Sequence, residues 1–243
     1  MANRVLSIDI GYSITKIVEV DFRQKNSKVY NCFAMQTPAG LVDDGYIKES
    51  EAFSTALREE LAKRDIKTKK VVFTITSTKI ANREVPIPAV KQNRIDSMVQ
   101  AKAGDYFPVD VRLYKFSYSI LDTLTEGDTK QYKLLVLATP KDLLESYYSL
   151  AENAGLTIEA LDYSGNSIIP VIKSTITDDV TMIIKVDERA TLLTVLSDTN
   201  IVLQRSVAYG ADAAIQAIEE HEVFGTDMTY QGALDLLRGH AII

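Results

Sequence analysis

The feature that most constrains this chain is a short polar turn between two apolar, β-branched segments near its amino terminus. The segments cover residues 5–10 and 14–20, and Gly11 lies in the turn between them. Valine, isoleucine and threonine are favoured on a pleated surface, and glycine marks a tight bend. The stretch therefore predicts two antiparallel strands joined by a turn.

The chemistry of this turn is suited to binding an anion. A tight bend exposes consecutive backbone N–H groups, which together with nearby hydroxyl and ammonium groups form a concave site for phosphate. Asp9 ends the first predicted strand and is placed to hold a hydrated Mg²⁺ beside that phosphate. An ordinary hairpin with a polar turn explains the same residues equally well. The candidate nucleotide-binding residues here are Asp9, Gly11, Tyr12, Ser13, Thr15 and Lys16, with Asp9 as the candidate metal residue.

Other nucleotide-binding and catalytic motifs fit less well. The sequence contains neither a Gly-x-x-x-x-Gly-Lys-[Ser/Thr] P-loop nor a Gly-x-Gly-x-x-Gly fingerprint after a strand. Lys16 falls inside the second predicted strand, so a phosphate at a helix amino terminus is not indicated. No Gly-x-Ser-x-Gly supports a serine hydrolase, and His221, His240 and Cys32 do not form a zinc-binding pattern.

Composition limits the class of protein. The 243 residues suit one large domain or two modest ones, and the net charge of -6 argues against a nucleic-acid binder. One cysteine cannot form an internal disulfide, which favours a reducing cytoplasm. No window approaches the roughly 20 apolar residues of a spanning helix, so a membrane role would come through a partner.

Periodicity and breakers predict a mixed α/β chain. Residues 85–160 are expected to form a compact α+β unit in the order helix–strand–strand–helix–strand. Ser50 is expected to cap the first helix, and Gly155 to end the third. Strands are predicted at 28–36, 71–76, 113–121, 132–138, 157–163, 182–187, 191–196 and 201–207, with a further apolar stretch at 80–87. Helices are predicted at 51–64, 90–104, 140–154 and 211–220, with a short helix interrupted by Pro170.

The opening pattern returns near residue 187. An apolar run leads to Asp187, a short polar turn follows, and a second apolar run begins at Thr191. Aligning Asp9 with Asp187 places Ser13 on Thr191, which indicates a duplicated unit whose two turns face each other across a nucleotide. Coincidence between two common hairpins is the alternative. The candidate nucleotide-binding residues of the second turn are Asp187, Arg189 and Thr191.

In this order and spacing, the chain resembles the actin-like ATPase superfamily and, within it, the PilM family of type IV pilus assembly proteins, relatives of the cell-division protein FtsA. The resemblance covers almost the whole chain. It is carried by residues 6–20, Val85-Pro86-Ile87-Pro88, Tyr106-Phe107-Pro108-Val109, residues 134–140, and Ala154-Gly155-Leu156 followed by Asp162.

The resemblance implies an α/β fold with an actin-like, ribonuclease H-like core and an inserted α+β subdomain. Residues 1–84 with 161–177 would form the first core subdomain, 85–160 the inserted subdomain, and 178–243 part of a second core subdomain. The second half is expected to be incomplete, because residues 200–243 lack the Gly-Gly pair of an adenosine motif. Either a truncated product or a natural short form explains this.

The resemblance also implies a function. Members of this family are cytoplasmic, lie beneath the inner membrane and bind the cytoplasmic tail of the membrane protein PilN, with other pilus platform proteins nearby. That tail would lie in a groove between residues 1–84 and 85–160. ATP or ADP with Mg²⁺ would lie in the cleft between the two halves, with weak ATPase activity at most. Half-buried tyrosines of residues 85–160 would either pack on the sheet or line the groove.

The second turn departs from the family pattern, because Asp187-Glu188-Arg189 stands where Asp-x-Gly is usual. Glu188 adds negative charge near the phosphate position. Arg189 either blocks the approach of phosphate or binds it as a cation. Loss of nucleotide binding is thus one interpretation. The alternatives of another class are an actin-fold ATPase or small-molecule kinase, for which Asp162 is the candidate acid, and an FtsA-like division protein.

Overall fold

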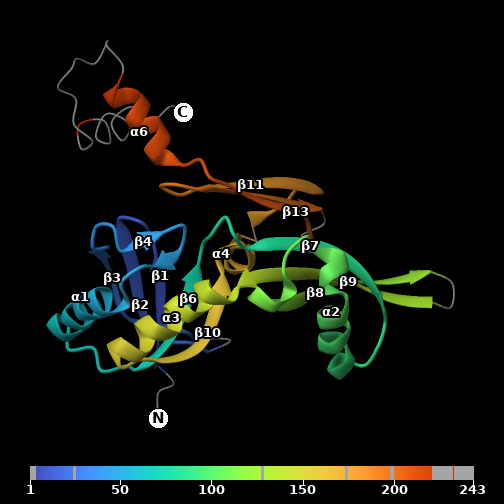
Figure 1. Cartoon of the computed structure of the whole chain (residues 1–243), viewed down its shortest axis with the longest axis horizontal. Helices are drawn as coiled ribbons and strands as arrows, with labels where there is room; N and C mark the ends of the chain where they lie inside the picture. The colour runs from blue at the N-terminus through green and yellow to red at the C-terminus, as the bar shows by residue number, and fades with distance from the viewer. Residues whose placement is uncertain are drawn as a thin grey trace.

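The computed structural model describes residues 4–23, 26–126, 129–172, 175–197, 200–220 and 232. Its strands form three main sheets and one small hairpin. The three sheets occupy separate regions of the molecule (Figure 1). The expectations for residues 221–231 and 233–243, including both histidines, lie outside the described residues.

The first sheet has the strand order β10-β6-β1-β2-β3. β1, β2 and β3 pair antiparallel, whereas β6 pairs in parallel with β1 and β10 in parallel with β6. Helices α1 and α3 cover one face (Figure 1). Their apolar side chains pack there against those of the strands. The elements are β1 (Arg4–Ile10), β2 (Ile14–Asp21), β3 (Lys28–Gln36), β6 (Lys70–Ile75), β10 (Thr157–Tyr163), α1 (Ser50–Lys63) and α3 (Lys141–Ala154).

A small hairpin of β4 (Val42–Asp43) and β5 (Tyr46–Ile47) follows β3. Its two turn residues, Asp44 and Gly45, have φ values of 45° and 82°. Positive φ at both positions is what a two-residue hairpin turn of the primed type requires, and Asp-Gly is a preferred pair for it. A Cβ at Gly45 would lie 2.4 Å from the Thr76 carbonyl oxygen, so the hairpin packs closely on the end of β6.

The inserted sheet has the order β7-β9-β8 and is antiparallel throughout. One face packs on α2 through a separate apolar core that includes Val85, Ile95, Val99 and Val136. The elements are β7 (Ala81–Pro88), α2 (Gln92–Tyr106), the 3₁₀ turn η1 (Val111–Leu113), β8 (Tyr114–Glu126) and β9 (Thr129–Pro140).

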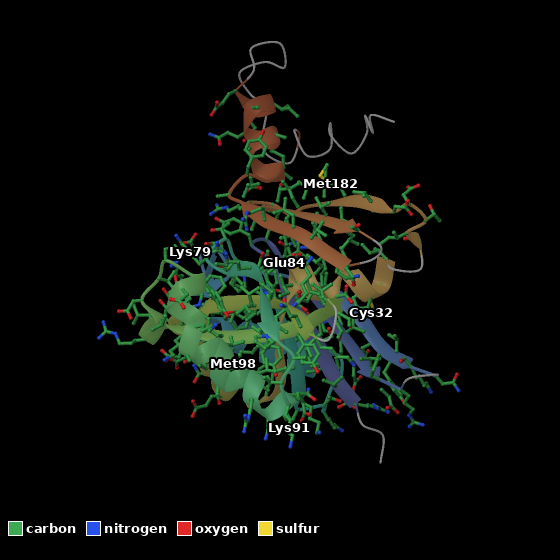
Figure 2. All side chains as sticks on the ribbon, turned by 90° about the vertical axis from the view of Figure 1, so that its right-hand side faces the viewer. Cys32, Lys79, Glu84, Lys91, Met98 and Met182 are labelled. Carbon is green, nitrogen blue, oxygen red and sulfur yellow. The ribbon has the colours of Figure 1, made fainter. Side chains whose placement is uncertain are left out.

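The distal sheet, with the order β11-β12-β13, lies above the other two sheets in Figure 1. Its inner face packs on the inserted sheet through Leu135, Leu196 and Ile201. Its outer face exposes Met182 (Figure 2). Val180, Ile184 and Val186 of β11 are exposed as well. The elements are β11 (Val180–Val186), β12 (Thr191–Ser197), β13 (Asn200–Val207) and α6 (Ala211–Glu219), reached through the short helices α4 (Ser164–Ser167) and α5 (Ile169–Ile172).

The structure differs from the expected subdomain boundary at residue 160. We expected α3 and β10 in the 85–160 unit, but α3 packs on the first sheet and β10 is one of its strands. The reason is that the apolar face of α3, with Leu143, Tyr147 and Leu150, packs in the first core. β10 also pairs in parallel with β6. The inserted unit therefore consists of β7, α2, β8 and β9.

Two helix ends test the capping expectations. Glu49, not Ser50, is the cap residue of α1, and Ser50 Oγ instead accepts a hydrogen bond of 3.0 Å from Asn153 Nδ2 of α3. Gly155 ends α3 as expected, in the left-handed region with a φ of 66°. None of the described helices is long and apolar enough to cross a membrane.

Candidate functional site

A cavity of about 660 Å³ lies where the β1–β2 turn and the β11–β12 turn meet. We call it the cleft cavity, and call residues 11–14 the first turn and residues 187–190 the second turn. Its volume is within the range typical of small-molecule sites. Its charged and hydroxyl-bearing lining residues are Asp9, Tyr12, Lys16, Asp43, Asp44, Thr76, Thr78, Lys79, Lys185, Asp187, Glu188 and Arg189.

The first turn is tightly closed. The Gly11 N–H donates to the Ile14 carbonyl at 3.0 Å, and a Cβ on Gly11 would lie 2.6 Å from that same oxygen. Only glycine fits here without a shift of the backbone. The Thr15 hydroxyl is buried on the other side of the sheet and lies 2.8 Å from the Thr37 hydroxyl. Thr15 therefore supports the turn from behind and does not line the cleft cavity.

Four polar residues occupy neighbouring register positions on adjacent strands at one end of the first sheet. Asp9 is paired with Lys16 on β2 and, in the parallel register, with Thr74 on β6, which in turn is level with Asp162 on β10. The Asp9 and Lys16 side chains both line the cleft cavity. Asp162 does not, because it lines a separate cavity two strands away.

The second turn resembles the first, but the register differs from the alignment made on the sequence. The Asp187 N–H donates to the Ala190 carbonyl at 2.9 Å, as Gly11 does to Ile14. Asp187 is thus the first residue of its turn, whereas Asp9 lies two residues before its own. Strand side chains repeat every two residues, so a shift of two keeps the same faces buried and leaves no signal in the apolar pattern.

The other residues of the second turn are already engaged. Asp187 is ion-paired with Lys185. The Thr191 hydroxyl donates to the Tyr209 carbonyl at 2.6 Å, so Thr191 supports its turn from behind, as Thr15 does. The carbonyls of Asp187 and Glu188 accept the first backbone N–H groups of α6, at 2.9 and 2.8 Å.

The two turns contact each other directly. The Ser13 N–H donates to Glu188 Oε2 at 2.7 Å. The Arg189 guanidinium lies 3.3 Å from the centre of the Tyr12 ring, close enough for a cation–π interaction, and its Nε lies 3.3 Å from Asp212 Oδ2. The structure therefore brings together residues that are 175 positions apart in the sequence.

Sequence reasoning missed the wall of the cleft cavity made by the β4–β5 hairpin and the β6–β7 loop. Asp44 accepts two hydrogen bonds from Thr78, from the backbone N–H and from the hydroxyl, each at 2.7 Å. The Asp43-Asp44-Gly45 turn is a readable hairpin signal, but nothing in the sequence pairs it with Thr78. Among the described residues, no group of three or more His, Cys, Asp or Glu is arranged to hold a metal ion.

A smaller cavity of about 230 Å³ lies between the first and inserted sheets, and we call it the groove. Asp162 lines it, and burial raises the pKa of this carboxyl, against the Tyr163 N–H, which lowers it. β8 lies at the edge of the inserted sheet, so its outer backbone groups face away from β9. Lining residues include Ile80, Ser117, Tyr118, Ser119, Leu144, Leu161 and Asn166.

Comparisons with known proteins agree with this architecture. A sequence model of the family described as "Type IV pilus assembly protein PilM" matches residues 7–230. The solved structure "PilM-PilN type IV pilus biogenesis complex" is similar to this chain, with a TM-score of 0.82 and 19% identity. The match covers 98% of this chain and 70% of the chain in that structure. EutJ, an ethanolamine utilization protein from Carboxydothermus hydrogenoformans, is similar over 96% of this chain and 60% of its own (TM-score 0.52, 11% identity). No curated protein matched in a sequence search.

These likenesses confirm the expected fold class, an α/β actin-like core with an inserted α+β unit. At these identities the structural matches establish the fold alone. The sequence match, which spans most of the chain, establishes the family.

Proposed function

Because this chain belongs to the PilM family of type IV pilus assembly proteins, we propose that it is a cytoplasmic scaffold of a type IV pilus or a related competence or secretion machine. It would lie at the inner face of the cell membrane, held there by a PilN-like membrane partner and near other pilus platform proteins. The similarity to a solved PilM–PilN complex supports this choice of partner.

The proposal of a PilN-like partner rests on the groove between the first and inserted sheets. Its lining combines apolar side chains, such as Leu144 and Leu161, with hydroxyl groups and one carboxylate. An extended peptide needs apolar pockets for alternate side chains and polar groups for its backbone. The groove supplies both, and it lies between the two units that we expected to hold the tail.

The edge position of β8 supplies a second feature that a peptide can use. An exposed strand edge offers a row of backbone N–H and C=O groups to an added strand. Ser117 and Ser119 are exposed on β8 and line the groove. We propose that the cytoplasmic tail of the PilN-like partner lies along β8 with alternate side chains directed toward Leu144 and Leu161.

A binding assay on two matched variants tests this proposal. The probe is a fluorescent peptide with the cytoplasmic tail sequence of the PilN-like protein encoded beside this chain. Ser119→Tyr fills the groove and is expected to weaken binding at least about tenfold, the loss of a buried anchor. Ser97→Tyr makes the same change on the exposed face of α2, outside the groove and away from β8, and is expected to bind like the wild type. Equal affinity of both variants, or cross-links confined to residues 180–220, would contradict the groove.

The cleft cavity is the proposed site for ATP or ADP with Mg²⁺. Its volume suits a nucleotide, and Lys16, Lys79 and Lys185 offer positive charge to phosphate oxygens. Asp9 lines the cavity and, by the chemistry of its carboxylate, would hold Mg²⁺ through water beside the phosphates. The nucleotide would act as a conformational ligand with at most weak hydrolysis.

We expect this binding to be weak, because Glu188 adds negative charge near the phosphate position and Arg189 stands where the family pattern has the glycine that admits phosphate. Titration calorimetry with ATP and Mg²⁺ measures the dissociation constant directly. A sub-micromolar value would contradict the expectation of weak binding. The absence of heat at millimolar nucleotide, in the wild type and in every cleft variant, would contradict the nucleotide site itself.

A further inference from the structure

The contact between Glu188 and the first turn places a negative charge on the turn that the sequence suggests for phosphate. The Glu188 carboxylate accepts the Ser13 N–H at 2.7 Å, a distance typical of a hydrogen bond to a charged acceptor. The Gly11 N–H is already taken by the Ile14 carbonyl within the turn. The Ser13 N–H is therefore a donor that the first turn presents to an outside anion, and Glu188 occupies it.

The position of Glu188 is fixed by its own surroundings. Its carbonyl accepts the Asp212 N–H at the start of α6, and a Cβ on Gly210 would lie 2.3 Å from the same carbonyl oxygen. The second turn is thus held on the end of α6 at close range. The backbone of Glu188 is held in place in this way. The position of the distal sheet over the first sheet therefore brings the Glu188 carboxylate to the Ser13 N–H.

Arg189 holds the other side of the same turn. Its guanidinium lies over the Tyr12 ring at 3.3 Å and also contacts Asp212. Adjacent residues of the second turn therefore contact adjacent residues of the first, one through a hydrogen bond and one through a ring face. Together they join the distal sheet to the first sheet beside the cleft cavity, which Tyr12, Glu188 and Arg189 line.

We propose that Glu188 is a built-in competitor for phosphate, which holds the cleft closed until the phosphate group of a nucleotide displaces it. This inference rests on the proposed nucleotide site and assigns its regulation. A phosphate that takes the Ser13 N–H must expel Glu188, since two anions repel and the donor serves one of them. The apparent affinity for nucleotide then equals the intrinsic affinity multiplied by the fraction of molecules in which Glu188 is already displaced. A small displaced fraction therefore means weak binding.

Calorimetry on two variants tests the competition. Glu188→Ala removes the competing group, and Glu188→Gln keeps an acceptor oxygen but removes its charge. Glu188→Ala is expected to bind ATP with Mg²⁺ about tenfold or more tightly than the wild type, and Glu188→Gln to gain less. Glu152→Gln, on the exposed side of α3, removes the same charge away from the cleft and is expected to change nothing.

A distance measurement without nucleotide tests the closing role separately. Cys32, the single cysteine, is exposed on the first sheet, and Met182 is 61% exposed on the outer face of the distal sheet (Figure 2). Spin labels on Cys32 and on Met182→Cys report the separation of the two sheets. We expect Glu188→Ala alone, and the wild type with ATP and Mg²⁺, to shift or broaden the distance distribution in the same direction.

The outcomes separate this inference from the nucleotide site. Measurable ATP binding that is equal in the wild type and Glu188→Ala would overturn the competition and leave the nucleotide site intact. A distance distribution that Glu188→Ala leaves unchanged would overturn the closing role. If no variant binds nucleotide, the nucleotide site fails, and with it the competition that Glu188 is proposed to provide.

Discussion

Asp9 and Lys16 face each other on neighbouring strands beside the cleft cavity, with 3.8 Å between Asp9 Oδ2 and Lys16 Nζ. The Lys16 side chain is 67% exposed, so this ion pair contributes little to folding. Its ammonium group is free to turn toward a phosphate oxygen. The pair therefore belongs to the chemistry of the cleft more than to the stability of the hairpin.

Lys16→Met is expected to lower the affinity for ATP about tenfold, the loss of one hydrogen bond to a charged group, and to leave the melting temperature unchanged. Calorimetry in the wild type and in the Glu188→Ala background measures the loss where binding is weak and where it is expected to be tighter. Lys67→Met, at an exposed lysine far from the cleft, is the control. A fall in melting temperature with unchanged affinity would assign Lys16 a structural role instead.

Gly11→Ala is expected to destabilise the first sheet, because the new methyl group would lie 2.6 Å from the Ile14 carbonyl oxygen. A backbone shift at such a turn costs on the order of 1–3 kcal/mol. Gly104→Ala is the matched control: it lies in α2, where the added Cβ meets only Val111 Cγ1 at 3.9 Å. That change is expected to stabilise the protein by about 0.5–1 kcal/mol. Urea unfolding measures the change in the free energy of unfolding for each variant, expected to be a loss for Gly11→Ala and a gain for Gly104→Ala. Equal changes would show that the turn tolerates a side chain.

The hairpins and helices of this chain were predictable, because they depend on local patterns. Alternating apolar residues set the faces of β1 and β2, and the left-handed cap at Gly155 follows from the one residue type that adopts it without strain. The inserted unit was predictable only in part. An amphipathic helix such as α3 shows that one face is buried, but not whether it packs on the first sheet or on the inserted sheet.

In the candidate site, too, features within one local segment were predictable and contacts between distant segments were not. Asp9, Gly11, Tyr12 and Lys16 line one cavity together, because all four lie within one local segment; that they bind nucleotide stays a prediction. The sequence suggested that Glu188 would lie near phosphate, but not that its carboxylate would bind Ser13. The Asp44–Thr78 contact gave no signal either. Contacts between segments that far apart depend on how whole sheets stack, which no local pattern encodes.

Tyr147→Phe is expected to stabilise the protein. The ring is fully buried and packs edge-on against Phe73 at 5.4 Å, while its hydroxyl has no hydrogen-bond partner among the described residues. Burying an unpaired hydroxyl costs on the order of 1–3 kcal/mol, and phenylalanine keeps the ring contacts without that cost. Tyr147→Ala, which leaves a cavity, is expected to lose about 3–5 kcal/mol. A Tyr147→Phe variant less stable than the wild type in urea would show that the hydroxyl is hydrogen-bonded in solution.

Asp162→Asn is expected to raise the melting temperature at neutral pH. Burial raises the pKa of this carboxyl, despite the opposing Tyr163 N–H, so the folded protein binds a proton more readily than the unfolded chain. Stability is then lost as the pH rises from the ordinary aspartate pKa, about 3.9, through the raised value of the folded state. Asparagine carries no charge and keeps an oxygen for the Tyr163 N–H, so it avoids that loss.

The advantage of Asp162→Asn should therefore be greatest above the raised pKa and should vanish at a pH below about 3.9, where the wild-type carboxyl is protonated in both states. Melting curves from pH 3 to pH 8 measure it, with exposed Asp178→Asn as the control. A cationic side chain of the partner tail in the groove would favour the charged carboxylate, so saturating tail peptide should reduce the difference at neutral pH. A difference that is constant over the whole pH range would show that the effect does not come from titration of Asp162.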